Sequence, residues 1–133
     1  MTHLLDTNTC IRYLNGRVVN VRVKMASMPV GSVTVCSIVK AEMYTGAEKS
    51  QDPLRTRTAQ DAFLNGFASL PFDDAAALIY ASLRARLETR GTPIGPYDLQ
   101  IAAIALANNL TLVTHNTREF SRVPGLLLED WEA

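Results

Sequence analysis

The chain has 133 residues, of which 47% are hydrophobic and 20% charged, a composition typical of a folded globular protein and not of a disordered one. A chain of this length can bury a core of its own, so we expect a single domain over residues 1–133. Thirteen basic and thirteen acidic residues give a net charge of zero, which excludes the overall positive charge by which very basic domains bind nucleic acid. Any phosphate-binding surface must therefore be local.

The strands are expected in short apolar runs that alternate with longer helical stretches. This alternation predicts an α/β fold, in which βα units surround a mainly parallel sheet. The segment Leu70-Pro71-Phe72 is too short to assign. The predicted strands, in chain order, are His3–Leu5, Val33–Cys36, Thr111–Thr114 and Leu126–Leu128.

The helices are expected between these strands. Gly91 to Pro96 holds two glycines and two prolines, so it is predicted to be a loop. Ser37 is expected to cap the third helix, and the last helix is apolar on nearly every face, which predicts burial. The predicted helices are one from Asp6-Thr7-Asn8 to Asn15-Gly16, Val18–Met28, Ile38–Lys49, one opened by Pro53 that carries Phe63, Leu64 and Phe67, one from Asp73-Asp74 to about Arg90, and Asp98–Asn108.

The two cysteines and the N-terminus bear on the compartment. Cys10 and Cys36 lie in apolar segments, which favours buried thiols in a reducing environment over a disulfide framework. The N-terminal segment reaches Asp6 after two leucines, too early for a signal-peptide core, and no apolar run has the length of a membrane span. We therefore expect a cytoplasmic protein without a membrane segment.

Four polar residues are predicted to approach the edge at which the parallel strands end. Asp6 follows the first strand, Asn116 follows the strand at 111–114, Asp98 opens a helix, and Glu42 lies just over one turn into another helix. Ligands bind at this edge of α/β sheets. Mg²⁺ prefers oxygen ligands, and such a site hydrolyses phosphodiesters by activating water and neutralising charge on the phosphate.

Each of these residues also has a structural explanation. Asp6 and Asp98 are equally suited to cap helices, Glu42 to lie in solvent on a helix, and Asn116 to form a turn. His3 and His115 leave open a metal-free cleavage of RNA by acid/base catalysis, although both positions favour structural roles. Candidate phosphate contacts near the same edge are Arg12, Lys40, Arg118 and Arg122.

Several segments, spread over essentially the whole chain, resemble the PIN domains of VapC-type toxins. Their order and spacing carry the resemblance, since no single short motif is specific. The segments are Leu4-Leu5-Asp6-Thr7-Asn8, Ser37 with Glu42, Tyr44-Thr45-Gly46-Ala47-Glu48-Lys49-Ser50, Pro96-Tyr97-Asp98, Thr114-His115-Asn116-Thr117-Arg118-Glu119-Phe120 and Glu129-Asp130-Trp131.

The resemblance implies a three-layer α/β/α sandwich and an endoribonuclease that depends on Mg²⁺ or Mn²⁺. It also implies a toxin held silent by a cognate VapB-type antitoxin, and a homodimer. The motif Asn116-Thr117-Arg118-Glu119-Phe120 resembles that of family members that act on initiator tRNA. The resemblance therefore implies an RNA substrate, specifically tRNA cut in its anticodon region.

The resemblance also implies roles for individual residues. Asp6 and Asp98 would be the principal metal ligands. Glu42 would bind metal directly or through water and help to orient the attacking water. Asn116 stands where many PIN domains have a fourth aspartate, and would hydrogen-bond a water or phosphate oxygen; Glu119 would partly compensate for its missing charge. Lys40 would contact RNA.

Two other functions remain open. One is a PIN-like module that binds RNA or a partner without cutting, which the presence of all three carboxylates disfavours. The other is a phosphoaspartyl enzyme or receiver domain with Asp6 as nucleophile, but position 8 is Asn and Glu42 then has no clear role.

The expected antitoxin contact lies along the helices from Ile11 to Met28. An antitoxin segment would pack there and place a basic side chain among the carboxylates. The apolar side chains expected to receive it, unless they belong to the core, are Val18, Val21, Met25 and Met28.

Overall fold

A five-stranded sheet forms the centre of the computed structural model, which describes all residues from Met1 to Ala133. The strand order is β3-β2-β1-β4-β5, and every neighbouring pair is parallel. The chain runs from β1 outward to β2 and β3, then crosses to the other side of β1 for β4 and β5. The strands are β1 (His3–Leu5), β2 (Val33–Cys36), β3 (Ala68–Leu70), β4 (Thr111–Val113) and β5 (Leu128–Glu129).

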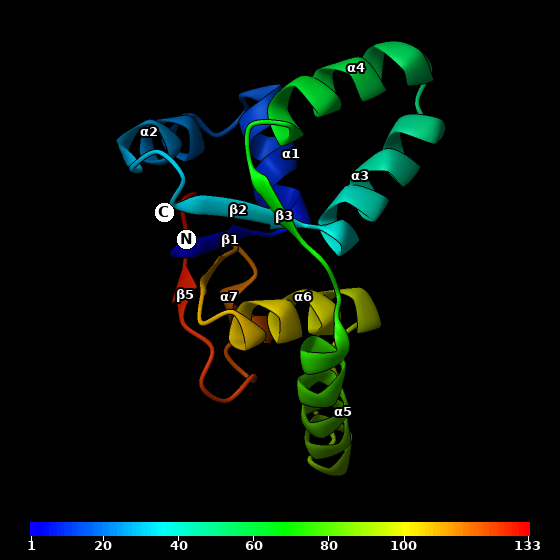
Figure 1. The fold of residues 1–133 in the computed structure, drawn as a ribbon, viewed down its shortest axis with the longest axis vertical. Helices are drawn as coiled ribbons and strands as arrows, with labels where there is room; N and C mark the ends of the chain where they lie inside the picture. Colours follow the sequence, from blue (N-terminus) through cyan, green and yellow to red (C-terminus); the bar gives the residue numbers. More distant parts are fainter.

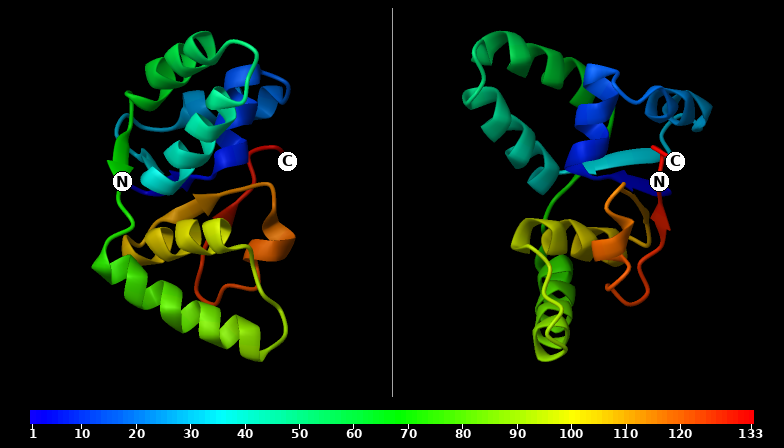
Figure 2. Two further views of the ribbon diagram at one scale, coloured as in Figure 1. Left: turned by 90° about the vertical axis from the view of Figure 1, so that its right-hand side faces the viewer. Right: turned by 180° about the vertical axis from the view of Figure 1, so that it is seen from behind.

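Seven helices connect the strands. They are α1 (Thr7–Asn15), α2 (Val19–Ser27), α3 (Ser37–Glu48), α4 (Pro53–Leu64), α5 (Asp74–Thr89), α6 (Pro96–Ala107) and α7 (Thr117–Phe120). Helices α1 to α4 lie over one face of the sheet, and α5 and α6 cover the other (Figures 1 and 2). The predicted α/β fold and its three-layer sandwich are therefore confirmed.

Helix boundaries follow local chemistry that the sequence displays. The carboxylates of Asp6, Asp52 and Asp73 cap α1, α4 and α5, each accepting a hydrogen bond from the backbone N–H three residues on, which satisfies a donor that the helix leaves free. Asn109 adopts a left-handed conformation with φ 54° just beyond α6, and asparagine tolerates that conformation better than most residues.

The core lies on both faces of the sheet and is densest around α6. Leu4, Leu5 and Val35 of the central strands are fully buried, as are the five consecutive residues 101–105 of α6, in agreement with the prediction that this helix is buried. Cys10 and Cys36 are free thiols inside the core. None of the helices has the length and apolar character needed to cross a membrane.

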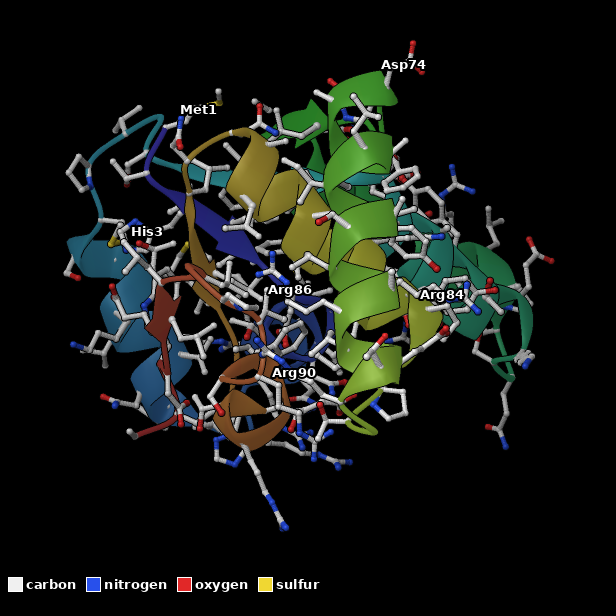
Figure 3. All side chains as sticks on the ribbon, turned by 90° about the horizontal axis from the view of Figure 1, so that it is seen from below. Met1, His3, Asp74, Arg84, Arg86 and Arg90 are labelled. Atoms are coloured by element: carbon white, nitrogen blue, oxygen red, sulfur yellow. The ribbon has the colours of Figure 1, made fainter.

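Helix α5 carries its charges in the order that a helix dipole favours. Asp73 caps the helix and Asp74 lies in the first turn. Arg84, Arg86 and Arg90 lie toward the other end, which Figure 3 shows from below. The predicted helix from Asp73-Asp74 to about Arg90 is therefore confirmed.

Three local predictions are wrong, and one strand is missed. Ser37 does not cap α3; Cys36 holds the cap position and no side chain bonds there. Phe67 lies beyond the end of α4, and the segment from Asn116 contains the short helix α7 instead of a simple turn. Strand β3 was not predicted, because Ala68 and Ser69 are exposed and an edge strand without an apolar face gives little pattern.

The apolar surface expected on α2 is also different. Val21 is fully buried, and Val18, Met25 and Met28 are partly buried against the core. Their spacing therefore reflects packing. The large apolar side chains that are exposed in this region are instead Ile11, Val19 and Val23.

Candidate active site

The carboxyl ends of β1 and β4 lie side by side at the centre of the sheet. Leu5 pairs with Val113, so Asp6 and Thr114 leave neighbouring strands at the same level. The chain reverses its direction of strand addition between these two strands, and open α/β sheets bind ligands at such a switch point. The predicted position of the site is therefore a natural opening in this topology.

Asp6 caps α1 and also faces this opening. Its Oδ1 accepts a hydrogen bond from the Thr9 backbone N–H at 2.8 Å. Burial raises the pKa of the Asp6 carboxyl, while hydrogen bonds from Thr9 and Thr114 oppose this rise. The capping interpretation of Asp6 is thus confirmed, and it is compatible with a second role for the same side chain.

Glu42 is not a solvated helix residue. The Thr7 hydroxyl donates to Glu42 Oε1 at 2.6 Å and links the start of α1 to the middle of α3. This bond holds the long side chain toward the opening. Nothing in the sequence pattern singled out Thr7 beyond its place in the N-terminal motif.

Asp98 does not cap α6, so that interpretation is wrong. Gly95 occupies the cap position, and Asp98 is the third residue of the helix. Burial, followed by repulsion from Glu119, Glu42 and Asp6, raises the pKa of the Asp98 carboxyl to about 6. Four carboxylates from four different segments therefore interact electrostatically. Asp6, Glu42, Asp98 and Glu119 together are the acidic site of this molecule.

Asn116 and Glu119 bind one another at the start of α7. Asn116 Nδ2 donates to Glu119 Oε2 at 2.8 Å, and the Gly95 backbone N–H donates to Glu119 Oε1 at 3.3 Å. Glu119 thereby joins the start of α7 to the start of α6, beside Asp98. The sequence indicated Glu119 only as partial compensation for a neutral Asn116; the path of the loop brings it into the acidic site.

The four candidate phosphate-binding residues make no ion pair with the acidic site. Arg12 lies 3.8 Å from Glu132, and Arg122 donates to the Pro93 carbonyl at 3.3 Å. Lys40 is half-buried and Arg118 is exposed. None of the ion pairs in the protein includes a member of the acidic site.

The two histidines have carboxylate partners of their own. His3 Nε2 lies 2.9 Å from Glu129, and His115 Nδ1 lies 3.0 Å from Asp130. The hydrogen bond with Asp130 raises the pKa of His115. Both imidazoles therefore make structural contacts, His3 with β5 and His115 with the residue after β5. These are the structural roles that their sequence positions favour.

The donor chemistry of the acidic site suits a hard divalent cation. No three His, Cys, Asp or Glu side chains lie close enough together, as they are oriented, to ligate one ion. Mg²⁺, however, usually keeps several waters and uses only one or two carboxylates. Every charged neighbour that contributes to the raised pKa of Asp98 is a carboxylate, and burial contributes most. Asp6 and Asp98, with Glu42 and Glu119 beside them, are the side chains that fit such an ion.

Comparison with known proteins places the chain in a family. The PIN domain family matches residues 3–126. The "tRNA(fMet)-specific endonuclease VapC" proteins of Salmonella typhimurium and Shigella flexneri are 38% and 40% identical over 96% of this chain and of their own. "Ribonuclease VapC2" of Rickettsia felis is 35% identical over 99% of both chains.

Solved structures agree with this placement. DNA-bound VapBC from Salmonella typhimurium has a TM-score of 0.93 at 37% identity and 98% coverage of each chain. VapBC2 from Rickettsia felis, bound to a promoter DNA fragment, has a TM-score of 0.90 at 34% identity, covering 98% of this chain and 99% of that one. The sheet, the helical layers and the sequence motifs all point the same way: this chain belongs to the PIN domain family, among the VapC ribonucleases.

Proposed function

We propose that this PIN-domain protein is the toxin of a toxin–antitoxin pair, an endoribonuclease that hydrolyses phosphodiester bonds in RNA with the help of Mg²⁺ or Mn²⁺. The observation that carries the proposal is geometric: Asp6 after β1, Glu42 in α3, Asp98 in α6 and Glu119 in α7 come together where the central parallel strands end. Burial and these neighbouring carboxylates raise the pKa of Asp98 to about 6. Repulsion of this kind lowers stability and is tolerated where a cation or a reaction requires it. PIN-domain nucleases generally depend on divalent metal ions.

Each member of the site has a role in this proposal. Asp6 and Asp98 would hold the cation, and a bound cation would supply positive charge for the phosphate and an activated water. Glu42, held by Thr7, would bind the cation directly or through water and help to orient the attacking water. Asn116 positions Glu119 through their 2.8 Å hydrogen bond and offers its amide to a phosphate oxygen. Arg12, Lys40, Arg118 and Arg122 are proposed to bind more distant phosphates of the RNA.

The proposed substrate is tRNA, with initiator tRNA cut in the anticodon region as its specific form. Two relatives at 38% and 40% identity carry the name tRNA(fMet)-specific endonuclease. The zero net charge of the chain argues against indiscriminate binding of nucleic acid, which rests on positive charge. A folded RNA recognised at a few points fits this balance better.

The proposed partner is a VapB-type antitoxin, because the structural relatives are VapBC complexes. We expect an antitoxin segment along α1 and α2, where Ile11, Val19 and Val23 are exposed, with a basic side chain reaching the acidic site. An inhibitory complex whose contacts lie entirely on the opposite face would contradict this. The free toxin is proposed to be a cytoplasmic homodimer.

The test is an RNA-cleavage assay with partner-free protein and a panel of purified tRNAs. We expect one or a few tRNAs to be cut at a defined anticodon-region site when Mg²⁺ or Mn²⁺ is present, and none in EDTA. Undiminished cleavage in EDTA would refute the metal-dependent mechanism and revive the one that uses His3 and His115. Binding of RNA without any cleavage would identify the alternative, a non-cleaving PIN-like module.

A further inference from the structure

A cavity of about 290 Å³ adjoins the acidic site. Ile38, Ala41, Glu42 and Thr45 line it from one face of α3, and Tyr97 lines it from the first turn of α6. Because α3 and α6 belong to opposite helical layers (Figures 1 and 2), the cavity bridges the two layers. Glu42 belongs to both the cavity and the acidic site, so the two are continuous.

The chemistry of the lining restricts what can occupy the cavity. Its only charged group is the Glu42 carboxylate, which repels a phosphate. The Thr45 hydroxyl already donates to the Ala41 carbonyl at 2.8 Å. A volume of about 290 Å³ is at the lower limit for small-molecule sites and suits one ring system rather than an extended ligand. The occupant is therefore flat, uncharged or cationic, and small.

Tyr97 has no structural explanation. It is 60% exposed and is the only aromatic side chain among the exposed large hydrophobic residues. The other aromatic side chains contact each other, as Tyr13 does Phe63, are buried, or, in Tyr44, lie under the Arg57 guanidinium. Its hydroxyl makes no hydrogen bond within the protein. An exposed aromatic ring beside Asp98 is the kind of platform on which proteins stack an unpaired base.

We propose that this cavity binds the base of a nucleotide that adjoins the cleaved bond, stacked on Tyr97, with its own phosphate at the acidic site. The inference rests on the proposed ribonuclease function and specifies how that site selects its substrate. One nucleotide can span both features because Glu42 lines the cavity and also interacts with Asp98 in the acidic site. A base can enter only from a loop or single strand, so paired RNA is excluded.

The test uses a synthetic RNA copy of the initiator tRNA anticodon stem-loop, intact or with one abasic nucleotide at either side of the cleaved bond. Tyr97→Ala should lower kcat/KM on the intact RNA about tenfold or more, the range for loss of one stacked base. Tyr97→Phe, which keeps the ring, should recover most of that loss. Leu54→Ala is the matched control, since it truncates a side chain that is 78% exposed on α4, outside the cavity.

The abasic RNAs separate stacking from a general loss of activity. One of the two abasic RNAs should be cut about tenfold more slowly by the wild type but should lose little further with Tyr97→Ala, because both changes remove the same contact. Losses that simply multiply would overturn the inference while the proposed function stands. A wild-type protein that cuts no RNA at all would overturn both.

A second variant guards against misfolding of the first. Ala41 is exposed on α3 and lines the cavity, so Ala41→Trp should fill it without disturbing the core. We expect a similar loss of kcat/KM at an unchanged melting temperature. If Tyr97→Ala and Ala41→Trp leave cleavage unchanged and instead weaken antitoxin binding or dimerisation, the cavity belongs to a protein partner and the inference is wrong.

Discussion

Asp61 and Glu88, on the surfaces of α4 and α5, have basic partners, whereas the carboxylates of the acidic site have none. On α4, Arg57 lies 3.1 Å from Asp61, and on α5, Arg84 lies 2.9 Å from Glu88, each pair one helical turn apart. In the acidic site, four carboxylates have one another as neighbours and no basic partner.

The pKa values express the same difference. Hydrogen bonds from Trp131 and His3 lower the pKa of Glu129, so its charge is stabilised by folding. The pKa of Asp98 is instead raised to about 6, so its charge opposes folding. The clustered carboxylates therefore differ from the paired ones in having no compensating charge, which the proposed cation would supply. The variants below test that distinction.

The largest expected effect is on activity. Asp98→Asn should lower the rate of RNA cleavage more than about 100-fold. Even removing a residue that only orients a metal ligand typically lowers metal affinity or activity about 10- to 100-fold. The measurement is the initial rate on a purified tRNA at saturating Mg²⁺. Asp61→Asn makes the same chemical change at a paired surface acid and should cut RNA at the wild-type rate. Cleavage by Asp98→Asn at the wild-type rate would remove Asp98 from the mechanism.

Mg²⁺ itself should stabilise the protein. At about one hundred times its dissociation constant it should add about 2.7 kcal/mol to the free energy of unfolding, seen as a higher melting temperature. Asp98→Asn should gain clearly less, and Asp61→Asn as much as the wild type. If Mg²⁺ shifts none of these melts, the carboxylates do not form a cation site.

Removing the support of Glu42 should have a smaller effect. Thr7→Val keeps the side-chain shape but loses the 2.6 Å hydrogen bond to Glu42, and should lower kcat about tenfold. Thr58→Val is the control, since that hydroxyl donates only to the Leu54 carbonyl of its own helix. Equal rates for both variants would show that Thr7 does not orient Glu42.

The smallest expected effect is on stability without metal. Because the pKa of Asp98 is raised by folding, its contribution to stability is present below about pH 4 and is lost as pH rises through about 6. Two pKa units correspond to about 2.7 kcal/mol, and solvent screening of this half-buried group reduces that to about 1 to 2 kcal/mol. Loss of a favourable charge near the α6 N-terminus subtracts about 0.3 to 1 kcal/mol.

The metal-free Asp98→Asn protein should therefore be about 1 kcal/mol more stable than the wild type at pH 7 and equal to it below pH 4. Denaturant melts across this pH range, in EDTA, measure the difference. A variant that is less stable at every pH would mean that Asp98 serves the fold rather than an external ligand.

Much of the fold is predictable because its main signals are local. The β-branched run of β2 and the aspartate caps of α1, α4 and α5 depend only on residues close in sequence. Strand β3 is not predictable in this way, since Ala68 and Ser69 are exposed and their pairing with Thr34 and Val35 is set by the tertiary fold. Phe67 was assigned to α4 because its spacing from Phe63 also suits a helix.

The candidate site shows the same limit. Asp6, Glu42 and Asp98 stand at segment ends or in motifs that the sequence displays. The contact of Glu119 with Gly95 joins residues 24 positions apart through a loop, and no pattern encodes it. The cavity beside Tyr97 depends on how α3 and α6 approach each other, and it is visible only in three dimensions.

The strand order has a consequence for how the protein is made. Central strand β1 pairs with β4, and His3 lies opposite Thr111. This half of the sheet therefore cannot form before residue 111 has been synthesised. Contacts this distant along the chain form late, and translation at about 5 to 20 residues per second takes on the order of ten seconds for a chain of this length. The nascent polypeptide carries Asp6 from the start, whereas Glu119 is added 113 residues later. The acidic site therefore cannot assemble before the segment that carries Glu119 has been synthesised and has packed against the start of α6.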